Sequence, residues 1–508
     1  DIIYFLVFII YKFIFLSIFF LYFYTIMDYL DIKGINERKL KVQKQIDKIK
    51  EKAERVQNIK IQPTFKHMTK STDIVKKYII KHKRKVFGGM AINEAIRRKS
   101  KKDVFYTKET FPDFDFYSPE PITDMVNISN LLVQAGFKNV SAKEAFHPNT
   151  YKIKAENYSN EIADISYVWS YIYYKIPTFV INGIHFVSPK YQIMDVYRIL
   201  TNPMTGWHKI EKQYNRARLL EQFYILPETK QLLKKYKSKI LDKRNTFKYV
   251  TKLKENIIND IVKNNKDIIL VGDYAYNTLI KMSKINNYSK KLIIPDEISL
   301  IIKEDNYDKF IDSIIKYMKK CKICTNKKKI KITKFSPFLE LYDKSARISI
   351  NGHYVIRIYS TEICLPYQVF DNIKIGTYHL IMLFLYSRKF RSIISKNNKN
   401  NSIYEYMLAN LEYARERYFK KKSKIGIERT PFRELQVECM GTEIFTPFHY
   451  YVIRKQGVKN RGFEYFPKRG IKTPAEMKKN YFYPNRSGNQ EKDEIIINNN
   501  NNENDIKK

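Results

Sequence analysis

Hydrophobic positions recur along the chain with two different periods, which predicts both helices and strands. Apolar residues in 121–137 return every three or four positions, the spacing of a helix with one buried face. In 111–117, FPDFDFY, apolar and acidic residues alternate, as on a strand with one polar face. The segments 150–156 and 161–168 are also predicted strands, and 179–189 is a predicted hairpin around an Asn-Gly turn. These elements predict an α/β or α+β fold of mixed sheets flanked by helices.

Changes in composition divide the chain into segments of different character. Residues 36–60 are highly charged with a narrow apolar stripe at helical spacing, and 402–422 is a long helical pattern that ends in basic residues. The end of the chain contains five consecutive Asn residues and is low in complexity. The predicted organisation is an apolar leader (1–26), an N-terminal helical segment (27–75), a first domain (76–233), a second domain (234–400), a C-terminal helical or irregular region (401–485) and a disordered tail (486–508).

The apolar leader admits two interpretations. Residues 1–26 are long enough to span a bilayer, but they carry Lys12 at mid-span and contain no Ala or Gly. They begin with Asp1 rather than Met, and they consist mostly of residues that AT-rich noncoding DNA encodes. We therefore expect Met27 to be the native start and the protein not to associate with membranes; a membrane anchor is the alternative. A signal peptide is disfavoured, because a small-residue cleavage site and a basic first segment are both missing.

The chain is strongly basic, with 93 Lys and Arg residues against 52 Asp and Glu and a formal net charge of +41. Such a charge favours polyanionic partners such as nucleic acids and nucleotides. AT-rich coding also enriches Lys, Asn, Ile, Tyr and Phe, so the charge alone leaves a compositional explanation open. A hydrophobic content of 44% excludes a wholly disordered chain.

Four cysteines in a chain of this length do not form a disulfide framework, which favours a reducing compartment. Cys321 and Cys324 form one C-x-x-C, whereas Cys364 and Cys439 stand alone. A zinc site is disfavoured, because no second pair of ligands follows at a suitable spacing. The sequence also lacks the P-loop, dinucleotide-binding and nucleophile-elbow motifs, so these enzyme classes lose their main support.

The sharpest chemical signal is a set of three carboxylates on predicted strands. Asp113 and Asp115 share one strand face, because residues two apart point to the same side. Two such carboxylates repel each other unless a divalent cation such as Mg²⁺ lies between them. Asp164, on a later predicted strand, supplies a third carboxylate. Two-metal phosphoryl transfer needs such a set, with one ion activating a hydroxyl and the other stabilising the leaving group.

A glycine pair precedes the carboxylates at a predicted strand-to-helix turn. Gly88 and Gly89 have no Cβ, so their backbone N–H groups and the following helix N-terminus are predicted to hold phosphate groups. A lone D-x-D is common on exposed strands, and a lone Gly-Gly pair is usually only a turn. The combination of Gly-Gly, helix, D-x-D and a later Asp is more specific, and it resembles the DNA polymerase β-like nucleotidyltransferase superfamily.

A second part of the chain repeats the same pattern, which indicates an internal duplication. Phe87-Gly88-Gly89 resembles Val271-Gly272-Asp273, and Phe111-Pro112-Asp113 resembles Ile294-Pro295-Asp296. The first Gly precedes the Asp by 25 residues in one copy and by 24 in the other. Two Ile-Asn-Gly hairpins, at 181–183 and 350–352, also match. Chance similarity is the alternative explanation.

The second copy is predicted to be degenerate. Asp273 places a negative charge where phosphate would lie, and Asp296-Glu297-Ile298 lacks the second carboxylate of a D-x-D. Glu297 is expected on the opposite strand face. The predicted fold is therefore two tandem nucleotidyltransferase-like domains, the second without catalysis and with a role in RNA binding, dimerisation or structural support.

With these motifs and the contexts AFHPNTYKIK, WSYIYYKIPTF and SPKYQIMDVYRILTNP, the chain resembles the poly(A) polymerase catalytic subunits of giant DNA viruses over residues 30–485, and more distantly the poxvirus enzyme. The resemblance implies template-free addition of adenylate from ATP to RNA 3′ ends. By motif match, Asp113, Asp115 and Asp164 bind two Mg²⁺ or Mn²⁺ ions, and Gly88 and Gly89 bind the ATP phosphates. It further implies a homodimer, located in the viral factory of the host cytoplasm and in the virion.

Other functions stay open at this point. Within the superfamily, the alternatives are a uridylyl-adding, CCA-adding or oligoadenylate-synthase type of enzyme. A noncatalytic RNA-binding subunit is a further alternative, which the intact carboxylate set disfavours. The Lys-rich stretches 234–254, 319–334 and 415–424 are candidate RNA tracks, because each also contains Tyr, Phe or Ile. Solvated basic faces would look the same.

Overall fold

The structure is a computed structural model of the 508-residue chain. It describes residues 15–19, 21–22, 37, 40–56, 65–106, 112–145, 150–156, 161–168, 170–202, 206–226, 248–320, 329–335, 344–361, 363–394, 398–421, 430–433, 436, 438–441, 463–479 and 494–498. The chain divides into two compact units, one of residues 1–70 with 157–159 and the other of 71–156 with 160–508. Each unit is considered by itself.

The first unit contains helical segments with exposed side chains at 15–19, 21–22 and 40–56. Helix α2 begins at Phe65 and ends at Lys81. Within the described part of the chain, no helix combines the length and the apolar character that crossing a bilayer requires. Met27 and most of the apolar leader lie outside the described residues, so the predicted start at Met27 stays a prediction.

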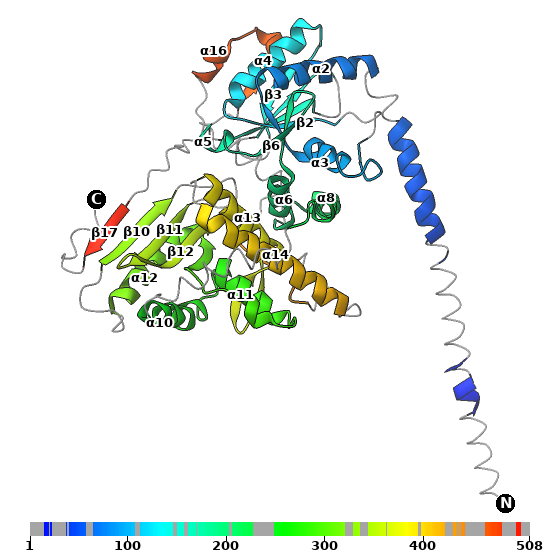
Figure 1. The fold of residues 1–508 in the computed structure, drawn as a ribbon. Helices are drawn as coiled ribbons and strands as arrows, with labels where there is room; N and C mark the ends of the chain where they lie inside the picture. Colours follow the sequence, from blue (N-terminus) through cyan, green and yellow to red (C-terminus); the bar gives the residue numbers. More distant parts are fainter. Residues whose placement is uncertain are drawn as a thin grey trace, which may run out of the picture. The chain divides into compact units, whose positions relative to one another are not determined.

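The second unit contains two mixed sheets (Figure 1). The first sheet has the order β16-β3-β4-β5-β2-β1-β7-β6. Its strands are β1 (Lys85–Val86), β2 (Phe114–Ser118), β3 (Ser141–Glu144), β4 (Thr150–Lys154), β5 (Ala163–Tyr167), β6 (Thr178–Ile181), β7 (Ile184–Val187) and β16 (Glu464–Tyr465). The pairs β2–β5 and β1–β7 are parallel, and the other pairs are antiparallel. Helices α3 (Gly88–Arg97) and α4 (Pro121–Gln134) pack on this sheet, and α5 (Ser170–Tyr173), α6 (Pro189–Leu200) and α8 (Ile210–Phe223) follow along the chain.

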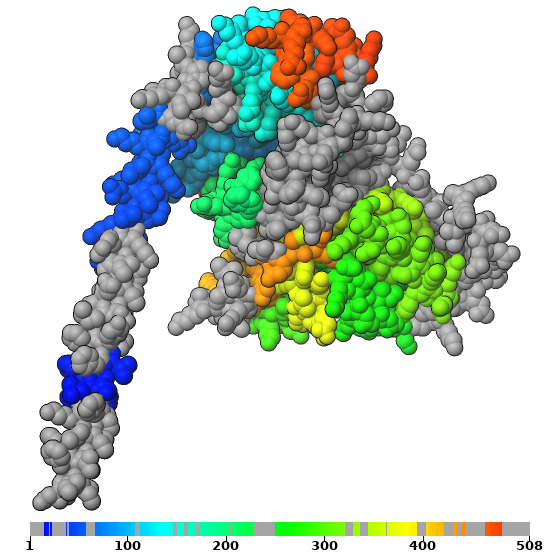
Figure 2. All heavy atoms as spheres, turned by 180° about the vertical axis from the view of Figure 1, so that it is seen from behind, coloured from blue at the N-terminus to red at the C-terminus, as the bar shows by residue number. Residues whose placement is uncertain are grey.

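The C-terminal part of the chain returns to the first sheet. Strand β16 pairs with β3, and the short helix α16 (Pro474–Lys478) packs on α4. Figure 2 shows this orange segment against the cyan part of the first domain. The Tyr465 hydroxyl donates to Asn130 Oδ1 at 2.5 Å and fixes the contact. Part of the region predicted as 401–485 therefore completes the first domain.

The second sheet has the order β15-β13-β14-β8-β9-β12-β11-β10-β17. Its strands are β8 (Ile268–Val271), β9 (Ile298–Lys303), β10 (Lys329–Phe335), β11 (Ser345–Ile350), β12 (His353–Thr361), β13 (Leu365–Phe370), β14 (Ile373–Gly376), β15 (Cys439–Met440) and β17 (Glu494–Asn498). Its helices are α10 (Lys248–Ile257), α11 (Gly272–Met282), α12 (Tyr307–Lys320), α13 (Tyr378–Ile394) and α14 (Asn398–Lys421). Strand β17 pairs antiparallel with β10, so the predicted disorder of the tail is wrong for these five residues. The run of three β-branched isoleucines favours the extended backbone there.

The two sheets share one topology, which confirms the predicted tandem fold. Reading outward from β1 and β8, the first sheet runs β2, β5, β4, β3, β16 and the second β9, β12, β11, β10, β17. On the other side, β7 and β6 match β14 and β13. The parallel pairs also agree, since β9–β12 and β8–β14 are parallel like β2–β5 and β1–β7. Helices α11 and α13 follow β8 and β14 as α3 and α6 follow β1 and β7.

The predicted match between the two Ile-Asn-Gly hairpins is wrong. Asn182-Gly183 joins β6 to β7, whereas Asn351-Gly352 joins β11 to β12. The equivalent of the first turn is Asp371-Asn372, where both residues have positive φ (49° and 59°). Two-residue hairpins require such left-handed backbone wherever they occur, so an Asn-Gly pair marks a local turn rather than a shared position.

A disulfide joins Cys364 to Cys439, with the Cα atoms 5.2 Å apart. The prediction that these residues stand alone is therefore wrong. The pairing of β13 with β15 brings the two together across 75 residues of sequence, a proximity that spacing alone does not reveal. Cys321 and Cys324 lie outside the described residues.

Buried contacts join the two halves of the second unit. Tyr191 of α6 packs on Phe390 of α13, with ring centroids 4.9 Å apart. The Tyr197 hydroxyl donates to Glu221 at 2.6 Å, and Arg415 of α14 reaches the same carboxylate at 3.4 Å. These contacts fix α6 and α8 against the second domain, and both helices carry residues of the site described next.

Candidate active site

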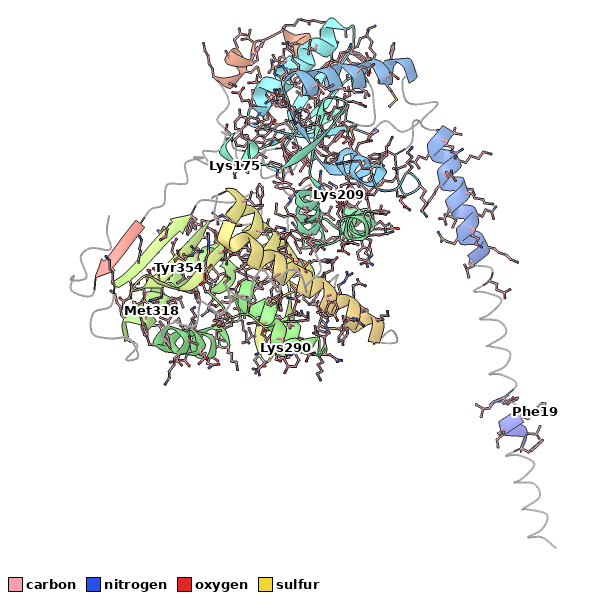
Figure 3. All side chains as sticks on the ribbon, viewed as in Figure 1. Phe19, Lys175, Lys209, Lys290, Met318 and Tyr354 are labelled. Carbon is pink, nitrogen blue, oxygen red and sulfur yellow. A yellow bond between two sulfur atoms is a disulfide. The ribbon has the colours of Figure 1, made fainter. Side chains whose placement is uncertain are left out.

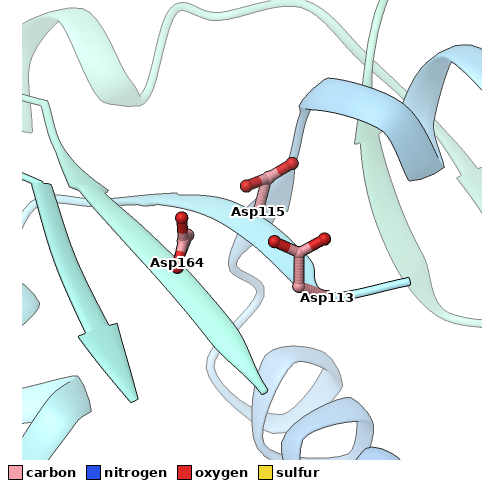
Figure 4. A group of neighbouring side chains, drawn as sticks. All are labelled: Asp113, Asp115 and Asp164. Carbon is pink, nitrogen blue, oxygen red and sulfur yellow. The ribbon is translucent and has the colours of Figure 1, made fainter. Parts of the chain in front are cut away.

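Asp113, Asp115 and Asp164 lie together at one end of the first sheet (Figure 4). Asp115 of β2 stands directly opposite Asp164 of β5 in the parallel register. Asp113 precedes β2 by one residue and faces the same side. One carboxylate oxygen from each residue lies within 4.8 Å of the others, and no other such group occurs among the residues that the structure describes. The structure therefore brings together the three carboxylates that the sequence indicates.

The electrostatics of these carboxylates fit a divalent cation. Burial, with the charges of Asp113 and Asp164, raises the pKa of Asp115 well above its ordinary value. Burial also raises the pKa of Asp164 to about 6, with Lys152 opposing the shift and Asp113 adding to it. The buried Oδ1 of Asp164 has no hydrogen-bond partner. Hard oxygen ligands that repel one another and include an unsatisfied buried oxygen are suited to hold Mg²⁺ or Mn²⁺.

The glycine turn positions a carboxylate as well as opening a helix. Gly88 begins α3 with a left-handed backbone (φ +67°), and a Cβ at this position would collide with the Asp115 carboxylate. The Gly88 N–H donates to Gln192 Oε1 of α6 at 3.3 Å. A Cβ on Gly89 would lie 2.7 Å from an Arg216 nitrogen. Both glycines therefore permit close approach at the site, and their predicted phosphate binding stays a prediction.

Two cations of α8, which sequence reasoning missed, face the carboxylates. Arg216 is buried, donates to the Tyr106 hydroxyl at 3.2 Å, and its charge opposes the rise in the pKa of Asp115. Lys212, one helical turn earlier, has a lowered pKa through burial and the charge of Arg216. The sequence signal was the i, i+4 pair of cations on one helix face.

Lys152 of β4 is a third cation at the site. It stands opposite Asp164 across the antiparallel pair, and its Nζ lies 3.6 Å from that carboxylate and 3.1 Å from Glu161. Burial opposes the charged form of Lys152, but the two carboxylates outweigh burial and raise its pKa. Lys152 therefore stays charged and partly compensates Asp164.

A cavity of about 70 Å³ lies beside the carboxylates. Tyr117, two residues beyond Asp115 on the same strand face, lines it, together with Phe87 and Tyr191. The Phe87 and Tyr117 rings are stacked 4.0 Å apart. Two charged residues of α6, Asp195 and Arg198, also line the cavity and form an ion pair at 3.0 Å.

The glycine turn of the second sheet identifies the positions that correspond to the three carboxylates of the first sheet. Gly272 opens α11 with a φ of +65°, and a Cβ there would lie 2.9 Å from the Ser299 Cβ. Val271, which precedes the glycine, pairs with Ser299, as the Phe87 N–H bonds to the Asp115 carbonyl in the first sheet. Ser299 therefore occupies the position of Asp115.

Two further equivalents follow from Ser299. Glu297, two residues earlier, takes the position of Asp113 and follows Gly272 by the same 25 residues. Arg357 of β12 stands opposite Ser299 and so takes the position of Asp164. Asp296 is thus one residue out of register, and the prediction that Glu297 faces the other way is wrong.

Glu297 is fully buried and ion-paired to Arg347 at 2.7 Å and to Arg388 at 2.9 Å. Burial alone would raise the pKa of Glu297, but these two arginines lower it to about 2. The set Glu297, Ser299 and Arg357 cannot hold a divalent cation, because it offers one carboxylate that is already paired. The predicted loss of metal chemistry in the second copy agrees with this arrangement.

Comparison with known proteins gives consistent similarities. Residues 73–206 match the family model "Poly(A) polymerase catalytic subunit", and residues 224–500, more than half of the chain, match "APMV, Putative poly(A) polymerase, catalytic subunit, C-terminal". The chain is 28% identical over 480 residues to the "Putative poly(A) polymerase catalytic subunit" of Acanthamoeba polyphaga mimivirus, covering 85% of this chain and 78% of that one. An African swine fever virus protein of the same description is 29% identical over 161 residues, 30% of this chain and 33% of that one. The crystal structure of the Megavirus polyadenylate synthase superposes with a TM-score of 0.73 at 24% identity, covering 86% of this chain and 87% of that one.

Proposed function

The chain belongs to the family of poly(A) polymerase catalytic subunits, and from this premise we propose that it adds adenylate from ATP to RNA 3′ ends without a template and releases pyrophosphate. The observation that carries the proposal is the convergence of Asp113, Asp115 and Asp164 within 4.8 Å. Of the two copies, the first has this set and the second has lost it. The activity is therefore assigned to the first domain.

The residues divide the work of phosphoryl transfer as follows. Asp113, Asp115 and Asp164 would together hold the divalent cations, with Asp113 and Asp115 serving the triphosphate and Asp164 serving the RNA 3′ hydroxyl. When bound, the cations lower the pKa of the attacking hydroxyl and neutralise charge on the leaving pyrophosphate. Arg216 and Lys212 face the same space and offer donors to the triphosphate oxygens.

The aromatic cavity is suited to the nucleotide base. Its Tyr117 and Tyr191 rings offer stacking surfaces, and Asp195 offers a hydrogen-bond acceptor for an exocyclic amino group. The charge of Asp195 adds to the rise in the pKa of Asp115, so the cavity adjoins the carboxylates. A base in this cavity would leave the phosphates near the metal ligands.

An extension assay tests the proposed function. A labelled oligo-RNA, Mg²⁺ or Mn²⁺ and each of the four NTPs in turn are incubated with the full chain. We expect long products with ATP alone, and none from an Asp115→Asn variant. Extension with UTP, or addition limited to CCA, would assign the chain to another terminal transferase. RNA binding without any extension would make it a noncatalytic subunit.

Kinship supports two further proposals about assembly and location. We propose a homodimer, tested by light scattering of the purified full chain at several concentrations. We also propose that the protein acts in the viral factory of the host cytoplasm and is packaged in the virion, tested by fractionation of infected cells and of purified particles. A monomer at all concentrations, or a protein missing from both fractions, would refute the respective proposal.

A further inference from the structure

A cluster of four arginines surrounds the position that corresponds to the metal site in the second domain. Arg347 of β11, Arg357 of β12 and Arg391 of α13 lie over the ring of Phe335, at 5.8, 4.2 and 5.4 Å from its centroid. Arg388, also of α13, donates to Ser299 Oγ at 3.1 Å. These four guanidiniums are called the arginine cluster below.

Arg357 is the centre of the arginine cluster. It is 5% exposed, its Nη2 donates to Ser345 Oγ at 3.3 Å, and its Nε has no partner. Within the described part of the chain, no carboxylate lies within ion-pair distance of its guanidinium. Burial, with the charges of Arg391 and Arg347, lowers its pKa to about 10, although Tyr359 and the more weakly acting Glu297 oppose the shift. An unpaired buried cation is unfavourable unless an anion joins it.

The carboxylates near the arginine cluster form no ion pair with Arg357. Glu297 forms ion pairs with Arg347 and Arg388. Asp273 accepts from the Asp296 N–H at 2.9 Å. Glu297 therefore compensates two of the four guanidiniums directly, and Asp273 is held by a backbone N–H. Arg357 is therefore the member of the cluster without a carboxylate partner among the described residues.

The arginine cluster opens toward solvent on one side. The Arg347 side chain is 20% exposed, and its guanidinium lies 4.3 Å from the ring of Tyr354, which is 44% exposed. Tyr354 lies on β12, three residues before Arg357 (Figure 3). A ligand entering here meets an aromatic surface first and the unpaired guanidinium behind it.

We propose that the second domain binds a phosphate group directly, without metal, through Arg357 with Arg347 and Arg391 beside it. Guanidinium donors match phosphate oxygens in a bidentate geometry. Because Arg357 stands where the first copy has Asp164, a position that binds cations in the first copy is suited to bind anions in the second. The phosphate comes from a polynucleotide backbone or from a free nucleotide. This site lies outside the catalytic residues, and its test does not depend on adenylate transfer.

Thermal melting of the full chain in EDTA tests the proposal. The ligands are inorganic phosphate, ATP and an oligo(A), and the variants are Arg357→Met and the matched control Arg417→Met, an exposed arginine of α14. We expect at least one ligand to raise the Tm of the wild type and of the control, and Arg357→Met to lose most of that rise. Without ligand, Arg357→Met should melt at the wild-type temperature or above, because an uncompensated charge has been removed. A lower Tm with an unchanged ligand response would overturn the proposal and make Arg357 a structural residue.

The three ligands distinguish the source of the phosphate. If oligo(A) is the ligand, the slope of log K against log salt should fall by about 0.7 in Arg357→Met, the value for one lost contact to a single strand. If the site takes nucleotides, ATP should show the loss of affinity and oligo(A) should not. Both results support the site. If Arg357→Met does not fold, Arg391→Gln at the rim is measured instead, and an affinity equal to wild type for all three ligands would refute the proposal.

Discussion

The first and second sheets place different side chains at the same three backbone positions, and at one of the three an acid is replaced by a base. In the first sheet these are Asp113, Asp115 and Asp164, and in the second they are Glu297, Ser299 and Arg357. The left-handed glycine turn and the strand order are the same in both. The comparison teaches that the turn and the register belong to the fold, whereas the chemistry depends on three side chains that the fold does not require.

The largest expected difference between the copies is in catalysis. Asp113→Ala or Asp115→Ala removes a carboxylate from a set of three, so adenylate incorporation should fall at least about a hundredfold. Asp296→Asn, in the second copy, should keep the rate within about a factor of three. Incorporation per enzyme per second is measured, with thermal melting as the control for folding. If well-folded Asp296→Asn lost activity, catalysis would have been assigned to the wrong copy.

Loss of the buried carboxylate in the second copy should have a larger effect on stability than loss of a surface carboxylate. Glu297→Gln leaves the buried Arg388 and the half-buried Arg347 without their carboxylate, which is expected to lower the free energy of unfolding by about 3 kcal/mol at pH 7. The folded pKa of Glu297 is about 2 and its ordinary value is 4.5, so this stability is present above pH 4.5 and is lost as pH falls toward 2. Chemical unfolding at a series of pH values from 7 to 3 measures the free energies of unfolding of variant and wild type, which should approach each other as the pH falls.

A matched control for Glu297→Gln is Glu464→Gln, because Glu464 and Lys143 form an exposed pair at 3.7 Å. Its cost should stay below about 1 kcal/mol at every pH. Equal costs for the two variants would mean that the buried carboxylate in the second copy contributes no more than a surface one.

The glycine turns should share a stability cost but differ in activity. Gly88→Ala and Gly272→Ala each force a left-handed backbone on alanine, which costs about 1–2 kcal/mol. In Gly88→Ala the new Cβ also displaces the Asp115 carboxylate, so incorporation should fall at least about tenfold. In Gly272→Ala it meets Ser299, and activity should be unchanged. Denaturant unfolding and the extension assay on both variants give the comparison, and equal activities would contradict it.

The smallest expected effect concerns the burial of the Asp164 charge, with repulsion from Asp113, in the metal-free first copy. The folded pKa of Asp164 is about 6 and its ordinary value is 3.8, so its contribution to stability is present below pH 3.8 and is lost as pH rises through 6. In EDTA, Asp164→Asn should therefore be more stable than wild type by about 1 kcal/mol at pH 8 and not at pH 4. Added Mg²⁺ should stabilise the wild type more than the variant. A variant that is less stable at pH 8 in EDTA would show that the Lys152 pair outweighs the repulsion.

The sequence was sufficient to predict the three carboxylates as one group. Alternation places Asp113 and Asp115 on one face, and a later strand with a lone Asp pairs beside them. It was not sufficient for Arg216 and Lys212, because α8 reaches the site through its packing on α3 and α6. Contacts of this kind depend on three-dimensional packing that no local pattern encodes.

The second copy was predicted in outline and misaligned in detail. The Pro-Asp match pointed to Asp296, whereas the turn at Gly272 and the register of Ser299 place Glu297 at the site. A shift of one residue reverses the face of a strand residue, so one wrong match hid the buried ion pairs of Glu297. Counting 25 residues from the glycine in both copies would have found the correct position.

The return of β16 and α16 to the first domain has a consequence for how the chain is made. Residues 463–479 leave the ribosome more than 300 residues after β3, the strand that β16 covers. During synthesis the edge of β3 therefore stays open while strands β8 to β15 of the second domain emerge, and open edges are prone to pair with other chains. The first domain is the earliest to be started and is still incomplete after most of the second domain has been made. A message truncated before residue 463 would therefore yield a protein with its catalytic carboxylates and an uncovered, aggregation-prone sheet edge.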